Sequence, residues 1–491
     1  MRWGRASGIL LHVTSLPGRF GIGELGPEAF RFADWLKEAG QQIWQVLPLG
    51  PVGYGESPYQ LFSAFAGNPL LVSIDTLAER GWLQAADVSR VPRFPASRVD
   101  FERVMPWKRR LLRRAFQNFR QRAAAADQDA FGEFCKSNCW WLDDFARFMA
   151  LKEANGNVAW AEWERSVAAD PEDIEYHQFL QFEFFRQWDA LKGYCHQRGI
   201  FILGDLPIYV ANDSADVWAH PELFRFDHVA GVPPDYFSAT GQLWGNPLYR
   251  WDRMAANGYR WWVDRMRAAL RMFDAVRMDH FRGFEAYWEV PATEKTAMNG
   301  RWVKGPGGSL FRTFQSELGE LPIIAENLGV ITPEVEALRH EFGLPGMAVL
   351  QFAFGADPQA PSFQPHNYVR DLAVYTGTHD NDTAVGWWRS QGGDSTRSAE
   401  QIEREKTRAC AYLATGGRRI HWALLRTALA SVADTVLAPM QDVLGLGSEA
   451  RMNTPSVASG NWRWRCRPAA LTDTLARDLR EMAELYDRTG K

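Results

Sequence analysis

The sequence predicts a single (β/α)8 barrel of the α/β class. Eight short apolar runs recur along the 491 residues, and most are hydrophobic at nearly every position, as are parallel strands covered on both faces. Helix-like patterns separate the runs, and this alternation is typical of a parallel barrel. A doubly wound nucleotide-binding sheet normally needs fewer strands, and no P-loop signature is present, so this alternative is disfavoured. The runs are Gly8–Ser15, Gln42–Pro48, Phe201–Val210, Ala275–Phe281, Ile323–Gly329, Met347–Phe354, Leu372–Thr378 and Thr435–Leu444.

Helix signals lie between several of the predicted strands. Pro27–Ala39 has a proline suited to the first turn, apolar residues on one face and a following glycine as a stop. Tyr259–Phe273 and Pro333–Phe342 show similar patterns. These segments are predicted to cover the outside of the barrel.

The spacing of the runs is uneven and predicts two insertions into one barrel that spans residues 1–491. About 150 residues separate the second and third runs, far more than a simple crossover needs. We expect residues from about 75 to 170 to form a mostly helical subdomain after the second strand. Residues from about 212 to 252 are rich in Pro, Gly and aromatics and are predicted to form a loop after the third strand. Further helical patterns are Trp107–Arg122, Asp129–Glu153 and Ile174–Arg198.

Composition narrows the class of partner. A formal net charge of -4 gives no reason to expect nucleic acid or an anionic membrane. The 22 Trp, 30 Phe and 13 Tyr fit a large core, and many tryptophans beside acids and amides also fit sugar binding. The five cysteines match no zinc or redox spacing and are expected to be free thiols. No signal peptide or membrane-length apolar run is present, so we expect a cytoplasmic protein.

The fourth run, Ala275–Phe281, brings an arginine and an aspartate together. Side chains alternate between the faces of a strand, so Arg277 and Asp279 are predicted to point the same way. An always-charged guanidinium keeps a neighbouring carboxylate ionised. An ionised, oriented carboxylate at the C-terminal end of a strand suits a covalent glycosidase mechanism. A structural ion pair is the alternative, and the other strand ends decide between the two.

Three more predicted strands also end in carboxylates. Barrel enzymes place catalysis at the C-terminal ends of their strands, where this chain has Asp205, Glu326 and Asp380 as well as Asp279. Four converging acids without a metal-type histidine cluster favour glycosidic chemistry, and they imply neither a metal nor a cofactor. Asp382 is interpreted instead as a helix N-cap.

The mechanism assigns a different role to each group. Asp279 is the candidate nucleophile. Glu326 follows an apolar strand, where partial desolvation raises its pKa and keeps a proton available, so it is the candidate general acid and then general base. Asp380 is expected to stabilise the oxocarbenium-like transition state or to hold sugar hydroxyls. His280 and His379 either donate hydrogen bonds to hydroxyls or are satisfied core side chains.

This ordered series resembles the amylomaltases, the 4-α-glucanotransferases or disproportionating enzymes of the α-amylase superfamily. The resemblance covers nearly the whole chain, and its most specific segments are Ser57-Pro58-Tyr59, Arg277–Phe284, Thr378–Thr383 and Pro233–Pro247. It implies a retaining transfer of an α-1,4-glucan segment through a covalent glucosyl intermediate, with Asp279, Glu326 and Asp380 as catalytic residues. It also implies a compact barrel without a C-terminal β-sandwich domain. Substrate contacts are implied for Tyr54, Asp205, Asp235, Trp244, Arg277, His280, His379 and Asn461.

The resemblance also implies the substrates and shows one departure. The expected partners are maltooligosaccharides and starch- or glycogen-type α-glucans, with glucose as an acceptor. The family often has a second acid after the catalytic glutamate, where this chain has Asn327. Loss of that negative charge is expected to lower the pKa of Glu326 slightly.

Two alternatives to glucan transfer stay open at this point. An α-1,4-glucan hydrolase of the amylase type uses the same acids with water as acceptor, and a non-catalytic glucan-binding protein needs only the aromatic surface. Water exclusion and acceptor binding decide between sugar and water. We expect the segment Pro233–Pro247 to cover the acceptor side, with Trp244 favouring transfer. We also expect the carboxyl groups of Asp279 and Glu326 to lie about 5–5.5 Å apart, as retention requires.

Overall fold

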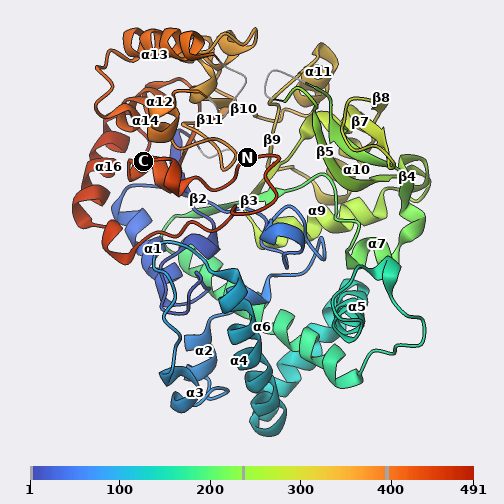
Figure 1. The fold of residues 1–491 in the computed structure, drawn as a ribbon. Helices are drawn as coiled ribbons and strands as arrows, with labels where there is room; N and C mark the ends of the chain where they lie inside the picture. The colour runs from blue at the N-terminus through green and yellow to red at the C-terminus, as the bar shows by residue number, and fades with distance from the viewer. Residues whose placement is uncertain (1–3, 235–237, 393–397, 491) are drawn as a thin grey trace.

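A parallel β-barrel forms the centre of the molecule. The computed structural model describes residues 4–234, 238–392 and 398–490 (Figure 1). Within them, eight strands form one sheet in the order β10-β11-β12-β1-β2-β3-β6-β9, and every pairing is parallel. The amide of Ala325 donates to the carbonyl of Pro345 at 2.8 Å across the remaining seam, between β9 and β10. The predicted (β/α)8 fold is therefore confirmed. The strands are β1 (Ala6–Leu10), β2 (Ile43–Gln45), β3 (Phe201–Leu206), β6 (Ala275–Met278), β9 (Ile323–Ala325), β10 (Gly346–Val349), β11 (Leu372–Tyr375) and β12 (Thr435–Pro439).

The strands are shorter than the apolar runs that predict them. At the end of several runs the chain leaves the sheet and turns, so the last residues of the run stand above the barrel rather than in a ladder. In the last run, for example, β12 ends at Pro439 and α15 (Met440–Val443) follows directly. The ends of the runs are thus the loops that carry the site.

Helices surround the barrel largely where the sequence places them. α1 (Pro27–Glu38) begins with its proline, has an acid in the first turn and a lysine in the last, and buries Phe32 and Leu36. α9 (Arg260–Met272) and α11 (Pro333–Glu341) lie within the predicted ranges. The others outside the insertions are α6 (Pro171–His196), α10 (Gly308–Leu318), α12 (Ala384–Arg389), α13 (Ala399–Leu413), α14 (Ile420–Ala430) and α16 (Asp473–Leu485).

The barrel interior is layered, and the layering positions the site. An apolar layer contains Leu203, Ala275 and Ile324, which pack together as buried residues. Side chains two residues further along a strand lie on the same face, so Asp205, Arg277 and Glu326 follow this layer toward the C-terminal ends of the strands. The polar layer therefore stands on a packed apolar floor, as in barrels whose interiors are filled by side chains.

Helices dominate the long insertion between β2 and β3. They form the blue-to-teal part of the molecule below the barrel in Figure 1, and α5 packs along α6. Their apolar faces bury aromatic residues such as Phe116, Phe119 and Phe145. The helices are α2 (Ile74–Glu79), α3 (Ala85–Ser89), α4 (Phe101–Arg122) and α5 (Ala125–Ala154).

The segment 212–252 is more regular than the predicted loop. It contains α7 (Ala215–Ala219), β4 (Phe224–Val232), β5 (Gln242–Tyr249) and α8 (Trp251–Ala256). β4 and β5 pair with β7 (Ala286–Pro291) and β8 (Arg301–Lys304) in an antiparallel sheet ordered β5-β4-β7-β8. Register shifts interrupt the β4–β5 ladder, and the glycines and prolines that accompany such irregularities hide the strand pattern in the sequence.

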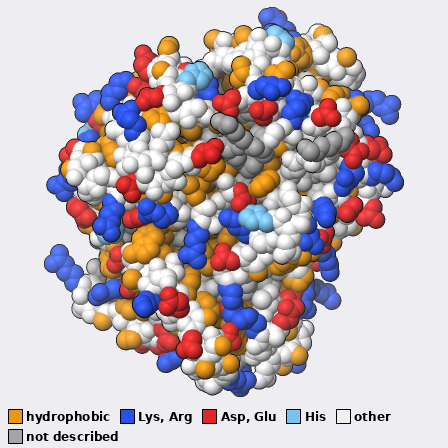
Figure 2. Space-filling view, turned by 180° about the vertical axis from the view of Figure 1, so that it is seen from behind, with side chains coloured by type: hydrophobic (Ala, Val, Ile, Leu, Met, Phe, Trp, Pro, Cys, Tyr) orange, Lys and Arg blue, Asp and Glu red, His pale blue; other side chains and the backbone are white. Residues whose placement is uncertain are grey.

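The cysteines and the surface charges are as the composition predicts. All five cysteines are free, as predicted. On the face shown in Figure 2 acidic and basic side chains are interspersed. Within the described residues, no helix combines the length and apolar character needed to cross a lipid bilayer.

Candidate active site

Arg277 joins two carboxylates at the end of β6. Its Nη1 lies 2.8 Å from Asp205 Oδ2 and 2.9 Å from Asp279 Oδ1. The prediction that Arg277 and Asp279 point the same way is therefore confirmed. The Asp205 side chain is fully buried, whereas that of Asp279 is 25% exposed. The Tyr59 hydroxyl donates to Asp205 Oδ2 at 3.0 Å. Asp205 thus anchors the arginine from below, and Asp279 is the carboxylate open to a ligand.

Glu326 is held in place by the backbone. It directly follows β9, and its carboxylate accepts from the amide of His280 at 2.7 Å and from that of Leu328 at 2.8 Å. Burial raises the pKa of Glu326 to about 7, the negative charge of Asp279 adds to the rise, and Arg277 opposes it. The sequence predicts this rise for the same reason, desolvation. A glutamic acid with such a pKa holds a proton near neutral pH.

His280 turns the chain between these two acids. Its backbone is left-handed, with φ of 50°, an uncommon conformation for a non-glycine residue. This turn aims the His280 amide at Glu326. Burial lowers the pKa of the imidazole to about 3, so the ring is neutral. Nε2 is buried and has no hydrogen-bond partner among the described residues, and the ring meets Trp244 edge to face at 4.8 Å.

Asp380 lies in the loop after β11, a strand that β10 separates from β9 in the barrel. Its side chain is 47% exposed. Its Oδ1 accepts from Asn453 Nδ2 at 2.6 Å, and its Oδ2 lies 3.5 Å from His379 Nε2. The Arg451 guanidinium donates to the backbone carbonyl of Asp380 at 2.8 Å. His379 is buried and stacks on Tyr59 with ring centroids 5.1 Å apart, and burial lowers its pKa. The residues around Asp380 come from distant parts of the chain.

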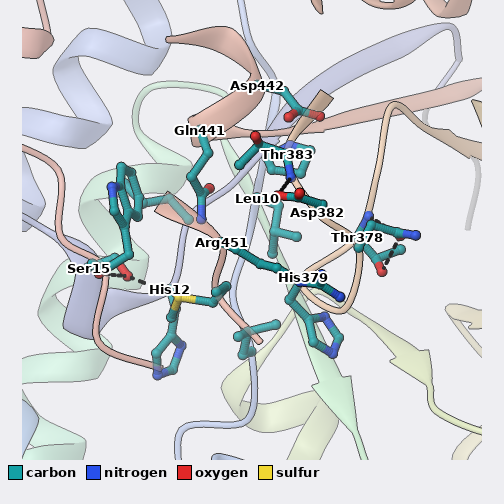
Figure 3. Close-up of a pocket in the computed structure, with 16 residues that line it drawn as sticks. Leu10, His12, Ser15, Thr378, His379, Asp382, Thr383, Gln441, Asp442 and Arg451 are labelled. Atoms are coloured by element: carbon teal, nitrogen blue, oxygen red, sulfur yellow. Dashed lines mark hydrogen bonds between the residues drawn. The ribbon is translucent and has the colours of Figure 1, made fainter. Parts of the chain in front are cut away.

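A small cavity of about 20 Å³ is lined by His379 and by residues at the ends of β1, β11 and β12 (Figure 3). Asp382 lines it and accepts from Ser448 Oγ at 2.6 Å. The helix N-cap of α12 is the next residue, Thr383, whose side chain accepts from the Gly386 amide. The interpretation of Asp382 as an N-cap is therefore wrong by one position, because the threonine hydroxyl fills that place.

Three other residues predicted to bind substrate lie in loops or outside the described residues. Tyr54 lies in the 3-10 turn Tyr54–Glu56, and Asp235 lies outside the described residues. The Asn461 side chain holds its own loop, since Oδ1 accepts from the Thr454 amide at 3.0 Å and Nδ2 donates to the Val457 carbonyl at 2.8 Å. Direct substrate contact by these three residues stays a prediction.

Asn327 serves the barrel wall rather than Glu326. Its Oδ1 accepts from the Met347 amide on β10, and its Nδ2 donates to Glu336 on α11, both at 2.8 Å. The main influences on the pKa of Glu326 are burial, Arg277 and Asp279, and Asn327 is not among them. The amide of Asn327 joins β10 and α11, and the effect on the pKa of Glu326 of having an asparagine rather than an acid here stays a prediction.

Two residues of the site escape the sequence analysis. Tyr59 is part of the motif Ser57-Pro58-Tyr59, yet its bond to Asp205 joins residues 146 positions apart. Asn453 binds Asp380 across 73 positions and follows no strand. The motif could have marked Tyr59 as functional, but no local signal in the sequence marks Asn453.

Fold and site together define a class of enzyme. A parallel barrel with an open aspartate, an arginine and a partly protonated glutamate at its strand ends is suited to cleaving glycosidic bonds with two carboxyl groups. The 4-alpha-glucanotransferase family model matches residues 11–472. The chain belongs to this family of transferases.

Known 4-alpha-glucanotransferases are similar to this chain over almost its whole length. A 4-alpha-glucanotransferase of Thermus thermophilus is 51% identical over 510 residues, covering 99% of each chain. One of Synechocystis is 51% identical over 506 residues, covering 99% of this chain and 98% of its own. Among solved structures, amylomaltase from Streptococcus agalactiae in complex with acarbose matches with a TM-score of 0.92 and 39% identity, covering 99% of this chain and 100% of its own.

Proposed function

We propose that this enzyme transfers α-1,4-glucan segments to the 4-hydroxyl of an acceptor glucose or glucan by a retaining mechanism. The observation that carries the mechanism is the pairing of Asp279 and Glu326 on the neighbouring strands β6 and β9, one open to a ligand and one desolvated. The transfer reaction is the activity named for the relatives above. Donors would be maltooligosaccharides and starch- or glycogen-type chains.

In the first half of the reaction Asp279 attacks the anomeric carbon of the donor sugar. The bond from that carbon to the glycosidic oxygen breaks, and Glu326 gives its proton to the departing oxygen. The leaving chain departs with a free 4-hydroxyl, and a glucosyl ester of Asp279 remains. Arg277 fixes the attacking carboxylate, and buried Asp205 acts through Arg277.

In the second half Glu326, now a carboxylate, accepts the proton of the acceptor 4-hydroxyl. The acceptor oxygen attacks the anomeric carbon and displaces Asp279, so two inversions give net retention. This sequence requires the two carboxyl groups to lie about 5–5.5 Å apart. A crystal structure with a bound maltooligosaccharide that showed them about 8 Å apart would instead indicate an inverting enzyme.

The surrounding groups would bind sugar hydroxyls and stabilise the transition state. Asp380, half exposed, is suited to the positive charge that develops on the sugar ring. The Nε2 of neutral His280, which has no hydrogen-bond partner among the described residues, can donate to or accept from a hydroxyl, according to its tautomer. We propose further substrate contacts for Tyr54, Asp235, Arg277, His379 and Asn461. The substrate contact predicted for Asp205 is replaced in this proposal by a role through Arg277, because the Asp205 side chain is fully buried.

Trp244 would favour sugar over water as the acceptor. It stands on β5 against His280, beside the site rather than beneath it. An indole there can stack on an acceptor sugar and exclude water. Trp244→Ala should therefore increase hydrolysis relative to transfer. An unchanged ratio of the two products would remove this role from Trp244.

Product analysis with pure maltotriose tests the proposed function. Transfer yields glucose together with chains longer than maltotriose, whereas a hydrolase yields glucose and maltose only. We expect maltopentaose and longer products from the first minutes of the reaction. Glucose and maltose without longer chains would favour the hydrolase, and no turnover at all would favour a non-catalytic glucan-binding protein.

A further inference from the structure

A second, larger cavity lies outside the barrel, and Asp279, Glu326 and Asp380 do not line it. It encloses about 250 Å³ between α5, α7 and the start of α9. Figure 1 shows α5 and α7 as neighbours below the antiparallel sheet. Among the residues that the structure describes, none of the catalytic or substrate-binding residues proposed above lines it. The mechanism therefore leaves this cavity unused.

Tryptophan provides the most open wall of the cavity. The side chain of Trp140 on α5 lines it and is 47% exposed. Phe65 packs edge to face against Trp140 at 4.9 Å and against Trp261 at 5.9 Å. Because Phe65 and Trp261 are themselves buried, the Trp140 ring rests on a fixed base. A rigid indole offers an apolar face at a low cost in conformational entropy.

Acids dominate the polar rim. His220 lies between Asp144, 3.9 Å from Nε2, and Glu222, 3.6 Å from Nδ1, and all three side chains are about half exposed. Buried Asp216 accepts from the Ala64 amide at 2.8 Å. Asp264 and Arg260 complete the rim. Asp264 is paired with Arg267 at 2.5 Å, so Asp144 and Glu222 are the more open carboxyl groups of the rim. They disfavour phosphates and other anions and provide acceptors for hydroxyl donors.

We propose that this cavity is an auxiliary binding site for a neutral sugar, a maltooligosaccharide segment of the glucan substrate. The apolar face of one glucose unit would stack on Trp140, while its hydroxyls donate to Asp144 and Glu222. This inference rests on the proposed function, because the ligand is a stretch of the same polymer. A long chain held here keeps its other segments at high local concentration near the barrel mouth, whereas maltotriose carries no such further segments.

Binding stoichiometry provides the direct test. Asp279→Asn should block turnover and leave both sites intact, so calorimetric titration with maltoheptaose should reveal two sites per chain. The double variant with Trp140→Ala should show one. Two sites in the double variant, or one site in both proteins, would overturn the proposal. Heat from choline that depends on Trp140, with none from maltoheptaose at that site, would overturn it in favour of a cationic ligand.

Kinetics separate failure of this inference from failure of the proposed function. In the otherwise wild-type enzyme, Trp140→Ala should raise KM for amylose about two- to tenfold, the effect of losing one aromatic contact, and leave maltotriose kinetics unchanged. Trp140→Phe should largely restore the low KM. Leu485→Ala removes a side chain that is 63% exposed on α16, outside the cavity, and should change neither. Normal transfer with an unchanged amylose KM in Trp140→Ala refutes only the auxiliary site, whereas a wild-type enzyme without transfer products refutes the proposed function.

Discussion

The two sides of the barrel mouth hold their acids by different means. On the β6–β9 side, Asp279 and Glu326 continue directly from strands, and their partners are Arg277 and backbone amides. On the β11 side, Asp380 lies in a loop, is half exposed, and is held by the side chain of Asn453. The first side is built into the core, and the second is assembled from loops.

This difference matches the chemistry proposed for each side. A nucleophile and a proton donor need fixed geometry and a low local dielectric, since both the pKa of the donor and the attack distance depend on them. A group that stabilises a sugar ring must leave room for the ring to enter. We therefore expect changes on the strand side to abolish catalysis and changes on the loop side to weaken it.

The largest effect is expected at Asp279. Asp279→Asn removes the nucleophile and should lower kcat by several orders of magnitude, as nucleophile loss does in other covalent enzymes, with little change in Tm. Initial rates with maltotriose and thermal unfolding measure the two quantities. Asp274→Asn makes the same substitution just before β6, at the opposite end of that strand, and should remain active. Substantial residual activity in Asp279→Asn would place the nucleophile elsewhere.

The second largest effect concerns the proton on Glu326. The acid form is needed to protonate the leaving oxygen, and burial raises the pKa of this group to about 7. As pH rises through that value the free enzyme loses the proton, so kcat/KM with maltotriose should fall, approaching tenfold per pH unit above it. The expected loss between pH 7 and pH 9 is about fiftyfold, because half of the enzyme already lacks this proton at pH 7.

An activated donor provides the control for this pH dependence. A maltoside with a 4-nitrophenyl leaving group departs without protonation, so its first step should not lose rate above pH 7. If both donors show the same decline, Glu326 is not the general acid, or the decline reports another group.

The sequence predicts the β6–β9 side of the site better than the β11 side. The Arg277–Asp279 pair is readable because strand periodicity puts residues two apart on one face, and Glu326 because it ends an apolar run. The contact between Asn453 and Asp380 depends on where a late loop folds back, 73 positions along the chain. Periodicity carries no information about such a contact.

The antiparallel sheet was hidden for a related reason. β4 and β5 contain glycine, proline and register shifts, and β8 is largely exposed. Their ladders, rather than an alternating apolar pattern, define them. Tertiary pairing therefore decided this structure where local propensity was weak.

The smallest of the three effects is expected at Asn453. Asn453→Ala removes the hydrogen bond to Asp380 and lets the carboxylate turn, and because water can replace the lost donor at this half-exposed position, kcat/KM should fall only about tenfold. kcat should account for most of the fall if Asp380 acts in the transition state. Asn155→Ala deletes an amide that bonds within the helical insertion and should leave activity unchanged. A rise in KM alone would assign Asn453 to ground-state sugar binding, and a lower Tm with normal kinetics would assign it to loop stability, so either result would refute its role in positioning Asp380 for the transition state.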